Sequence, residues 1–494
     1  MEVPMPTQRA VAAAKTVARA VADWLPPARP AQGEWIQAYS GKKRRKYQQA
    51  QQSLAENPIT RNDAGIMAFI KPEKIEDDTR DPRVIQARGA RYNYELGNYL
   101  KPIEHALYNI KGTRNLRNWL PPTRCIAKGL CMRKRALLLK KKWDRFTDPI
   151  CYSIDASRFD AHVTTMLEVE HLVYKRFYKD PHLDKLLAWQ LLNKCRTATG
   201  IRYSCYAGRM SGDMNTALGN CLISIIIAAS IMRELKIRKW DMLCDGDDVL
   251  LFFERSQAPS NIARHYLDYG FVIKTEVART LFEIPFCQSH VVETVEGLKM
   301  VQIPDRVLSR ALAGTKHWHE EKFRSKYLAL IGYCELALNM GVPVLQEFAL
   351  MVLSWGSELP PKPAFSGHVI KALREEKDHR IIQPLPISID ARATFTEAFG
   401  IELEEQLALE SQFRAQRFRY GSEKKATTFW QVARPAKACG SARRPPAEPP
   451  IPQQVKQKES CLQRSDEPRS RTSHHRVVRP LHSLSKLISF PGTS

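Results

Sequence analysis

The sequence predicts an α+β protein in which a region of alternating strands and helices is followed by a largely helical region. Two patterns carry this prediction. Between residue 151 and about residue 293, short apolar runs typical of buried strands alternate with helical periodicities. From residue 306 to about residue 430, apolar residues recur at helical spacing instead. The chain has 494 residues, 44% of them hydrophobic, which is enough to bury the core of one large multi-lobed unit or of two to three domains.

The charge balance favours a polyanionic partner. Lys and Arg outnumber Asp and Glu by 76 to 52, which gives a formal net charge of +24 and a pI near 9.6. Such an excess is expected of a protein that holds nucleic acid. On charge alone, the alternative is a basic surface that confers only solubility or loose membrane affinity.

The cysteines and the apolar stretches exclude other classes of protein. The 11 Cys residues are scattered singly, without a C-x-x-C pair, which predicts reduced thiols in a cytosolic setting. Cys125 and Cys131 lack a second Cys/His pair, so we expect no zinc site. No secretory signal is visible, and the longest apolar stretch, residues 221–232, is shorter than the roughly 20 residues of a membrane-spanning helix. It predicts a buried helix.

The first 150 residues combine a helix with basic segments. Residues 8–24 predict an amphipathic helix that ends before Pro26, and its Val and Trp stripe can pack on the body of the protein or lie on a membrane. The run GKKRRK at 41–46 is typical of a solvated face or of a nuclear-type address, and its charge also suits a channel that admits nucleic acid. The β-like runs IMAFI and RVIQ and their flanks carry basic side chains able to present a phosphate-binding surface, namely Lys71, Lys74, Arg83, Arg88 and Arg91.

Residues 151–293 predict strands and helices in alternation. CYSIDAS predicts a buried strand, LEVEHLVYKRFY and LDKLLAWQLL predict helices, and residues 213–235 predict a long apolar helix. MLCDGDDVLLFFE is typical of two strands joined by a tight turn at Asp245 and Gly246. The predicted helix NIARHYLDYG, closed by Gly270, precedes the strands FVIKTEVA and FCQSHVVE. From residue 434 onward, Pro, Ser, Gln and Arg predict a basic disordered tail.

Three acidic residues are suited to hold divalent metal ions. Nucleotide transfer uses two divalent ions about 4 Å apart, which activate the attacking 3′-hydroxyl and stabilise the leaving pyrophosphate. Magnesium often takes only one or two protein carboxylates. Asp155 at the end of a predicted strand and the Asp247-Asp248 pair in a hairpin satisfy this requirement. Gly-Asp-Asp alone is ordinary turn chemistry, so the prediction depends on the accompanying segments.

Two accompanying segments suggest how the ribose of a nucleotide is recognised. Asp160 lies just past the predicted strand end, where it can bond a ribose hydroxyl. In SGDMNTALGN (211–220), a glycine turn begins a helix on which Thr216 and Asn220 share one face that can reach Asp160. Because the 2′-hydroxyl distinguishes RNA from DNA, this set predicts an RNA product.

These segments resemble those of the RNA-dependent RNA polymerases of positive-strand RNA viruses. DASRFDAHV, GRMSGDMNTALGNCLIS, GDD and FCQSHVV are similar to the motifs of the tombusvirus group, in the same order, and the likeness covers about residues 35–300. The resemblance implies RNA-templated RNA synthesis from NTPs with Mg²⁺ or Mn²⁺. It also implies a right-hand fold with fingers, a palm built on an antiparallel sheet with helices on one face, and a helical thumb.

The resemblance further implies a role for each motif residue. Asp155 and Asp247 would be the principal metal ligands, Asp248 an auxiliary ligand and Asp160 the sugar sensor. The template- and ribose-selecting motif would comprise Ser211, Gly212, Thr216 and Asn220. The basic motif that clamps the triphosphate would comprise Lys71, Lys74, Arg83 and Arg88. Lys274 would be the general acid for pyrophosphate, with a solvated strand-edge charge as the alternative, and residues 286–289 would grip the primer end.

The predicted organisation is an N-terminal basic helix (1–30), fingers (31–150), a palm with part of the fingers (151–300), a thumb (301–433) and the tail (434–494). Expected partners are single-stranded RNA template, nascent RNA, NTPs, viral or host replication proteins and, peripherally, a membrane. The expected location is the host cytoplasm, at membrane-associated replication sites. A reverse transcriptase and a non-catalytic RNA-binding replication or packaging protein are the alternatives.

Overall fold

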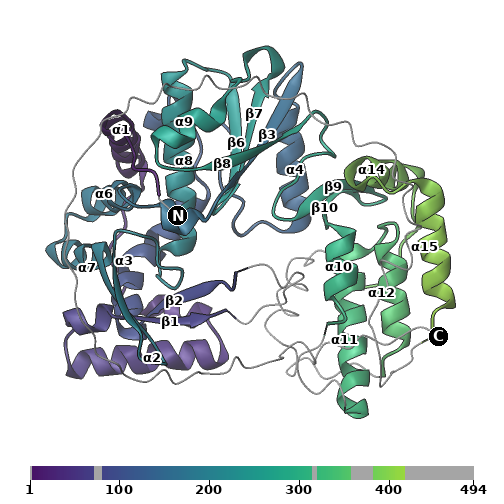
Figure 1. Cartoon of the computed structure of the whole chain (residues 1–494), viewed down its shortest axis with the longest axis horizontal. Coiled ribbons are helices and arrows are strands. Elements are labelled where there is room, and N and C mark those ends of the chain that lie inside the picture. The colour runs from purple at the N-terminus through teal and green to yellow at the C-terminus, as the bar shows by residue number, and fades with distance from the viewer. Residues whose placement is uncertain (1–2, 72–80, 314–319, 358–381, 418–494) are drawn as a thin grey trace, which may run out of the picture.

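The structure is a computed structural model that describes residues 3–71, 81–313, 320–357 and 382–417 (Figure 1). Lys74 and the predicted tail, residues 434–494, lie outside the described residues. Three sheets are present in the described part of the chain, with four, four and two strands. Both helices and antiparallel strands contribute, as an α+β fold requires.

The central sheet is antiparallel and has the strand order β6-β7-β3-β8. Its strands are β3 (Pro149–Ala156), β6 (Trp240–Asp245), β7 (Asp248–Glu254) and β8 (Ile273–Ala278). The register of β6 and β7 ends at Asp245 and Asp248, so the turn consists of Gly246 and Asp247, one residue later than we predicted. Gly246 has φ 84°, a conformation that favours glycine.

Both faces of the central sheet are covered. On one face, Ile154, Cys244 and Val249 join the core that contains α8 (Thr216–Glu234). On the other face, Cys151 and Leu250 pack with side chains of α4 (Met132–Trp143) and of the hairpin formed by β9 (Ser289–Thr294) and β10 (Gly297–Gln302). Figure 1 shows α8 and α4 on either side of these strands. Helical cover therefore extends to the second face, which the expectation of helices on one face did not include.

Helix α8 is the buried helix expected from the apolar stretch. It is apolar on all sides, which is typical of a helix surrounded by protein. Among the described residues it is the one helix with the length and composition of a membrane span, but 83% of that window is buried inside the protein. Residues 213–215, which we had included in the helix, form turns before it.

A second four-stranded sheet, which we call the N-terminal sheet, has the order β2-β1-β4-β5. Its strands are β1 (Ile66–Ile70), β2 (Val84–Arg88), β4 (Leu192–Thr197) and β5 (Arg202–Tyr206). Strands β1 and β4 pair in parallel, and the other pairs are antiparallel. We predicted β1 and β2 but not β4 and β5. Helices α2 (Gly41–Glu56) and α3 (Ala90–Tyr108) contact each other beside the sheet (Figure 1).

The N-terminal helix α1 (Gln8–Trp24) has the bounds that the sequence predicted. Ala14, Val17 and Val21 on its apolar face are buried against α6 (Met166–Tyr178) and α8. The helix therefore packs on the body of the protein, as one of our two alternatives proposed, while Arg19 on its other face is exposed.

The C-terminal described part is helical around its own core, as predicted. The hairpin β9 (Ser289–Thr294) and β10 (Gly297–Gln302) leads into α10 (Pro304–Arg310), α11 (Glu321–Asn339), α12 (Leu345–Ser354), α14 (Ile389–Phe399) and α15 (Leu403–Ala415). Val292, Phe348, Phe395 and Phe413 belong to the shared core. Further helices are α5 (Phe159–His162), α7 (Pro181–Leu191) and α9 (Ile262–Asp268). Short 3-10 turns are η1 (Glu34–Ala38), η2 (Arg61–Ala64), η3 (Arg114–Leu116) and η4 (Arg255–Gln257).

Candidate active site

Charged side chains form a row across the central sheet. Asp155 on β3 is paired with Lys274 on β8, and Asp248 on β7 is paired with Asp245 on β6. The β3–β7 register runs to Ile154 and Val249, so the next positions, Asp155 and Asp248, are neighbours. Residues paired across strands point to the same face of a sheet. Lys274, Asp155, Asp248 and Asp245 therefore lie side by side on one face.

Asp247 lies in the turn at the end of this row. The turn is held against α8, because the Ser224 hydroxyl donates to the Gly246 carbonyl at 2.9 Å and the Gly246 N–H donates to Cys221 Sγ at 3.1 Å. The side chains of Asp155, Asp247 and Asp248 are all exposed to solvent. The β6–β7 hairpin and the end of β3 thus bring the three predicted metal ligands to one end of the central sheet.

The acids of this row influence one another. Desolvation by the surrounding protein, followed by the negative charge of Asp247, raises the pKa of Asp248 to about 6, and Asp245 and Asp155 add to the effect. Clustered carboxylates with raised pKa values are a common feature of functional sites. In the described chain, no three His, Cys, Asp or Glu side chains are close enough to enclose an ion by themselves.

Asp160 and Asn220 meet, as the sequence predicted. The Asn220 amide donates to Asp160 Oδ1 at 2.9 Å, and the Arg209 Nε–H donates to Asn220 Oδ1 at 2.9 Å. Arg209 is buried in an ion pair with Glu170. Burial raises the pKa of Asp160, which the hydrogen bond from Asn220 and the charge of Arg209 partly offset. The orientation of Asp160 is therefore fixed from within the core.

The loop before α8 is attached to the N-terminal sheet. The Gln86 N–H donates to the Ser211 hydroxyl at 3.0 Å, and the Gly212 N–H donates to the Gln86 carbonyl at 2.9 Å. A Cβ on Gly212 would lie 2.6 Å from the Ala87 Cα, so only glycine fits this approach. The Thr216 hydroxyl donates to the Met210 carbonyl at 2.8 Å. Ser211, Gly212 and Thr216 therefore fix the loop, while Asn220 reaches Asp160.

Comparison with known proteins identifies the family. The family model described as "Viral RNA dependent RNA polymerase" matches residues 1–420. The chain belongs to this family.

Curated relatives from plant viruses agree with the family assignment. The RNA-directed RNA polymerase of turnip crinkle virus is 36% identical over 396 residues, which cover 76% of this chain and 49% of the relative. Those of carnation mottle virus and tomato bushy stunt virus (strain Cherry) are 34% and 33% identical, over 77% and 76% of this chain and 50% and 46% of the relative. The chain spans about half the length of these relatives.

The basic residues of the predicted triphosphate-binding motif are divided between two environments. The Lys71 N–H donates to the Arg83 carbonyl at 2.8 Å beside the β1–β2 hairpin, and the charge of Arg83 acts on Asp160. Arg88 differs from our prediction, because its guanidinium is buried and bonds both carboxylate oxygens of Asp213 as well as Asn193 and a carbonyl. Arg88 therefore joins the N-terminal sheet to the loop before α8, and its guanidinium is not presented to a triphosphate.

The cations that neutralise Asp245 were missed by sequence reasoning. Asp245 forms ion pairs with Lys128 and with Arg135, the latter at 2.7 Å. These partners lie more than 100 positions earlier in the sequence, so no local pattern indicated them. Cys287, in the predicted primer-gripping segment, lies beside Asp248, and burial followed by this carboxylate raises the pKa of its thiol.

The segment 286–289 is a tight turn. Phe286 and Ser289 exchange backbone hydrogen bonds at 2.9 and 3.1 Å, and Cys287 and Gln288 have φ values of 52° and 60°. The turn carries Cys287 against the end of the acidic row. What this segment binds is not defined by these contacts, so its role with a primer stays a prediction.

Proposed function

We propose that the chain copies RNA by transferring nucleotides from NTPs to the 3′ end of a growing RNA strand. The observation that carries the proposal is that Asp155, Asp247 and Asp248 lie together at one end of the central sheet, near the hydrogen-bonded pair of Asp160 and Asn220. The electrostatic influence of Asp247 on Asp160 supports the proximity of the two groups. The family match and the names of the relatives support the same activity.

We further propose Mg²⁺ or Mn²⁺ as the cofactor, held by Asp155 and Asp247 with Asp248 as an auxiliary ligand. The donor set fits, because these are exposed oxygen ligands whose mutual repulsion a cation would relieve. Fewer than three protein ligands per ion is ordinary for magnesium, which retains waters and phosphate oxygens. When bound, the ions would lower the pKa of the 3′-hydroxyl and neutralise charge on the leaving pyrophosphate.

The chain's own residues would orient the substrates. The Asp160 carboxylate, fixed by Asn220, can accept a hydrogen bond from a ribose hydroxyl. Lys274 would give a proton to pyrophosphate, a role that its pairing with Asp155 and its exposure support. Arg83, whose charge reaches Asp160, would contact the triphosphate.

A right-hand arrangement is the finer architecture that we propose. The N-terminal sheet with α2 and α3 would correspond to the fingers, the central sheet to the palm, and α10 to α15 to the thumb. Residues 192–206 would also belong to the fingers, because their strands share the N-terminal sheet with β1 and β2. The Arg88–Asp213 ion pair would connect this sheet to the loop before α8. We also propose that synthesis takes place in the host cytoplasm at membranes, with viral or host replication proteins.

The metal assignment is tested by Asp247→Ala. We expect RNA synthesis by the purified protein to fall at least about a hundredfold, because electrostatic stabilisation at the reacting phosphate is lost. The matched control is Asp184→Ala, an exposed Asp in the first turn of α7 that should leave activity unchanged. Parental activity in Asp247→Ala would refute the assignment. RNA-templated dNTP incorporation by the parental protein would favour a reverse transcriptase, and salt-sensitive RNA binding without turnover would favour a non-catalytic protein.

A further inference from the structure

One face of the N-terminal sheet, which we call the outer face, carries cations without counter-charges. Arg196 on β4 is paired with Arg202 on β5 and with Met67 on β1, so the three side chains share this face. Lys194 lies two residues before Arg196 on the same strand and therefore also points there. Arg196, Arg202 and Lys194 are all exposed.

The opposite face of the sheet is occupied. Ile66, Cys195 and Met210 form a small core there, and the Arg88–Asp213 pair connects that side to the loop before α8. The outer face is therefore separated by the sheet itself from the residues that lead to Asp160 and Asn220.

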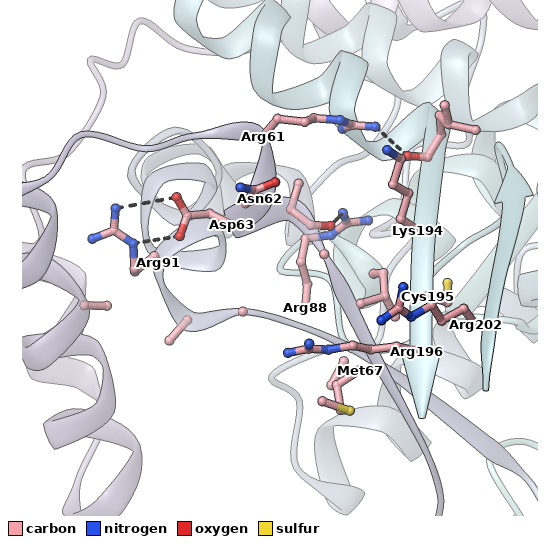
Figure 2. Close-up of a pocket in the computed structure, with 18 of the residues that line it drawn as sticks. Arg61, Asn62, Asp63, Met67, Arg88, Arg91, Lys194, Cys195, Arg196 and Arg202 are labelled. Atoms are coloured by element: carbon pink, nitrogen blue, oxygen red, sulfur yellow. Dashed lines mark hydrogen bonds and ion pairs between the residues drawn. The ribbon is translucent and has the colours of Figure 1, made fainter. Parts of the chain in front are cut away.

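The outer face borders a cavity of about 1160 Å³ between the sheet, α2 and η2. Figure 2 shows Arg61, Lys194, Arg196 and Arg202 around this cavity. Lys46, from the basic run that begins α2, also lines it. The single acidic residue of the lining, Asp63, is already ion-paired with Arg91 at 2.7 Å.

The charges of this surface are unfavourable in isolation. Within the described residues, Lys46, Lys194, Arg196 and Arg202 form no ion pair or side-chain hydrogen bond. Arg61 donates to the carbonyls of Trp189 and Leu192 at 2.8 and 2.6 Å, which orients its guanidinium without neutralising it. Like charges directly opposite each other on neighbouring strands destabilise a sheet. An anion that spans several of these side chains would remove the repulsion.

The same face also exposes aromatic rings. Tyr206 is paired with Leu192 and is 68% exposed, and Phe69, two residues beyond Met67, is 47% exposed. Interleaved cations and aromatic rings are the features by which proteins hold single-stranded nucleic acid, through phosphate contacts and base stacking. A rigid duplex would use the cations but not the rings.

We propose that the outer face of the N-terminal sheet, together with the first turns of α2, binds single-stranded RNA outside the carboxylate site. The RNA backbone lies along Arg61, Lys194, Arg196 and Arg202, and its bases stack on Tyr206 and Phe69. The proposal requires that the chain binds RNA, as the proposed function does, but it does not require that the chain catalyses nucleotide transfer.

The test is RNA binding by the full chain carrying Arg196→Ala and Arg202→Ala, measured by fluorescence anisotropy with a labelled unstructured RNA of about 20 nucleotides. We expect affinity to fall about tenfold and the slope of log affinity against log salt to become less steep by roughly 1.4, because two phosphate contacts are removed. The charge-matched control is Arg238→Ala with Arg264→Ala. Both arginines are exposed, and α9, which carries Arg264, lies at the opposite end of the protein from β1 and α2 (Figure 1). The control should retain parental affinity and slope.

Two further measurements make the result decisive. The thermal unfolding midpoint of the variant with Arg196→Ala and Arg202→Ala should not fall, because the two substitutions relieve repulsion between the arginines. The double variant Lys46→Ala with Lys194→Ala tests the same surface independently. Tyr206→Ala should weaken binding of single-stranded RNA about tenfold but leave binding of duplex RNA unchanged.

Unchanged RNA affinity in both double variants would overturn the proposal. A loss confined to self-association would assign the surface to a second copy of the chain instead, and a fall in kcat at saturating RNA with unaltered affinity would place the arginines in the catalytic cleft. Because binding is measured without NTPs, absence of turnover in the parental protein would contradict the proposed function and not this inference.

Discussion

At the scale of residues, the charges next to each Asp of the acidic row determine which of these residues can assist in binding a cation. Asp245 precedes the Gly-Asp-Asp turn and lies beside Asp248, yet its own charge is balanced by Lys128 and Arg135. Asp245, at one end of the row, is therefore neutralised, whereas its neighbour Asp248 and the turn residue Asp247 have no ion pair within the described residues. This difference explains why Asp248, and not Asp245, is suited to assist a cation.

Asp245→Asn tests that role. The substitution removes one negative charge and leaves the charges of Lys128 and Arg135 next to Asp248, which opposes cation binding. We expect the Mg²⁺ concentration for half-maximal RNA synthesis to rise about tenfold. Asp144→Asn, which removes an exposed carboxylate paired with Lys140 on α4, is the control and should leave the Mg²⁺ dependence unchanged. An unaltered Mg²⁺ titration in Asp245→Asn would contradict this account.

Asn220→Ala tests sugar selection. The change leaves Asp160 without the amide that orients it, so the preference for ribonucleotides over deoxyribonucleotides should fall by about tenfold. The measurement compares kcat/KM for one NTP and its dNTP on the same template. Ser230→Ala, which removes a buried hydroxyl that donates to the Ile226 carbonyl of the same helix, is the control. Retained activity with an unchanged NTP/dNTP ratio would remove the role.

At the scale of elements, the sequence predicted those whose signals are local. Helix α1 has its predicted bounds because Thr7 caps it and small apolar residues recur on one face. The turn between β6 and β7 was predicted at Asp245 and Gly246, but it consists of Gly246 and Asp247, with Gly246 in the left-handed conformation at its first position. Strands β4 and β5 were missed, because the buried positions of β4 are Asn193 and Cys195 and not large apolar residues. Their place in the sheet depends on pairing with β1, over 100 residues away.

The Arg88–Asp213 pair tests how these elements are joined. Arg88→Met leaves the Asp213 carboxylate buried without a cation, so the free energy of unfolding should fall by about 3–5 kcal/mol. Arg88→Met with Asp213→Leu should recover much of that loss, because both charges are removed. Chemical denaturation of the variants and the parental protein measures both effects. A raised KM for NTPs with parental stability in Arg88→Met would restore the triphosphate-clamping role that we first assigned to Arg88.

At the scale of the whole molecule, ordered motifs predicted the family better than they predicted the packing. Asp155, Asp160, Asn220 and the Gly-Asp-Asp turn follow one another within residues 1–420, the range that the family model matches. The buried partners that hold these residues, such as Glu170 for Arg209, come from helices whose sequences read only as amphipathic. Long-range ion pairs leave no periodic signal, so the structure was needed to find them.

Deletion of the basic segment 436–494 tests whether its cations contribute to RNA binding. Its deletion should lower RNA affinity and flatten the salt dependence, while synthesis on short templates persists, since each lost phosphate contact weakens binding without touching the acidic row. A variant with a Gly/Ser segment of equal length separates charge from chain length. If the two groups of cations contact RNA independently, the deletion combined with Arg196→Ala and Arg202→Ala should weaken RNA binding by close to the product of the separate factors. Collapse of short-template synthesis after the deletion would show that the segment takes part in catalysis.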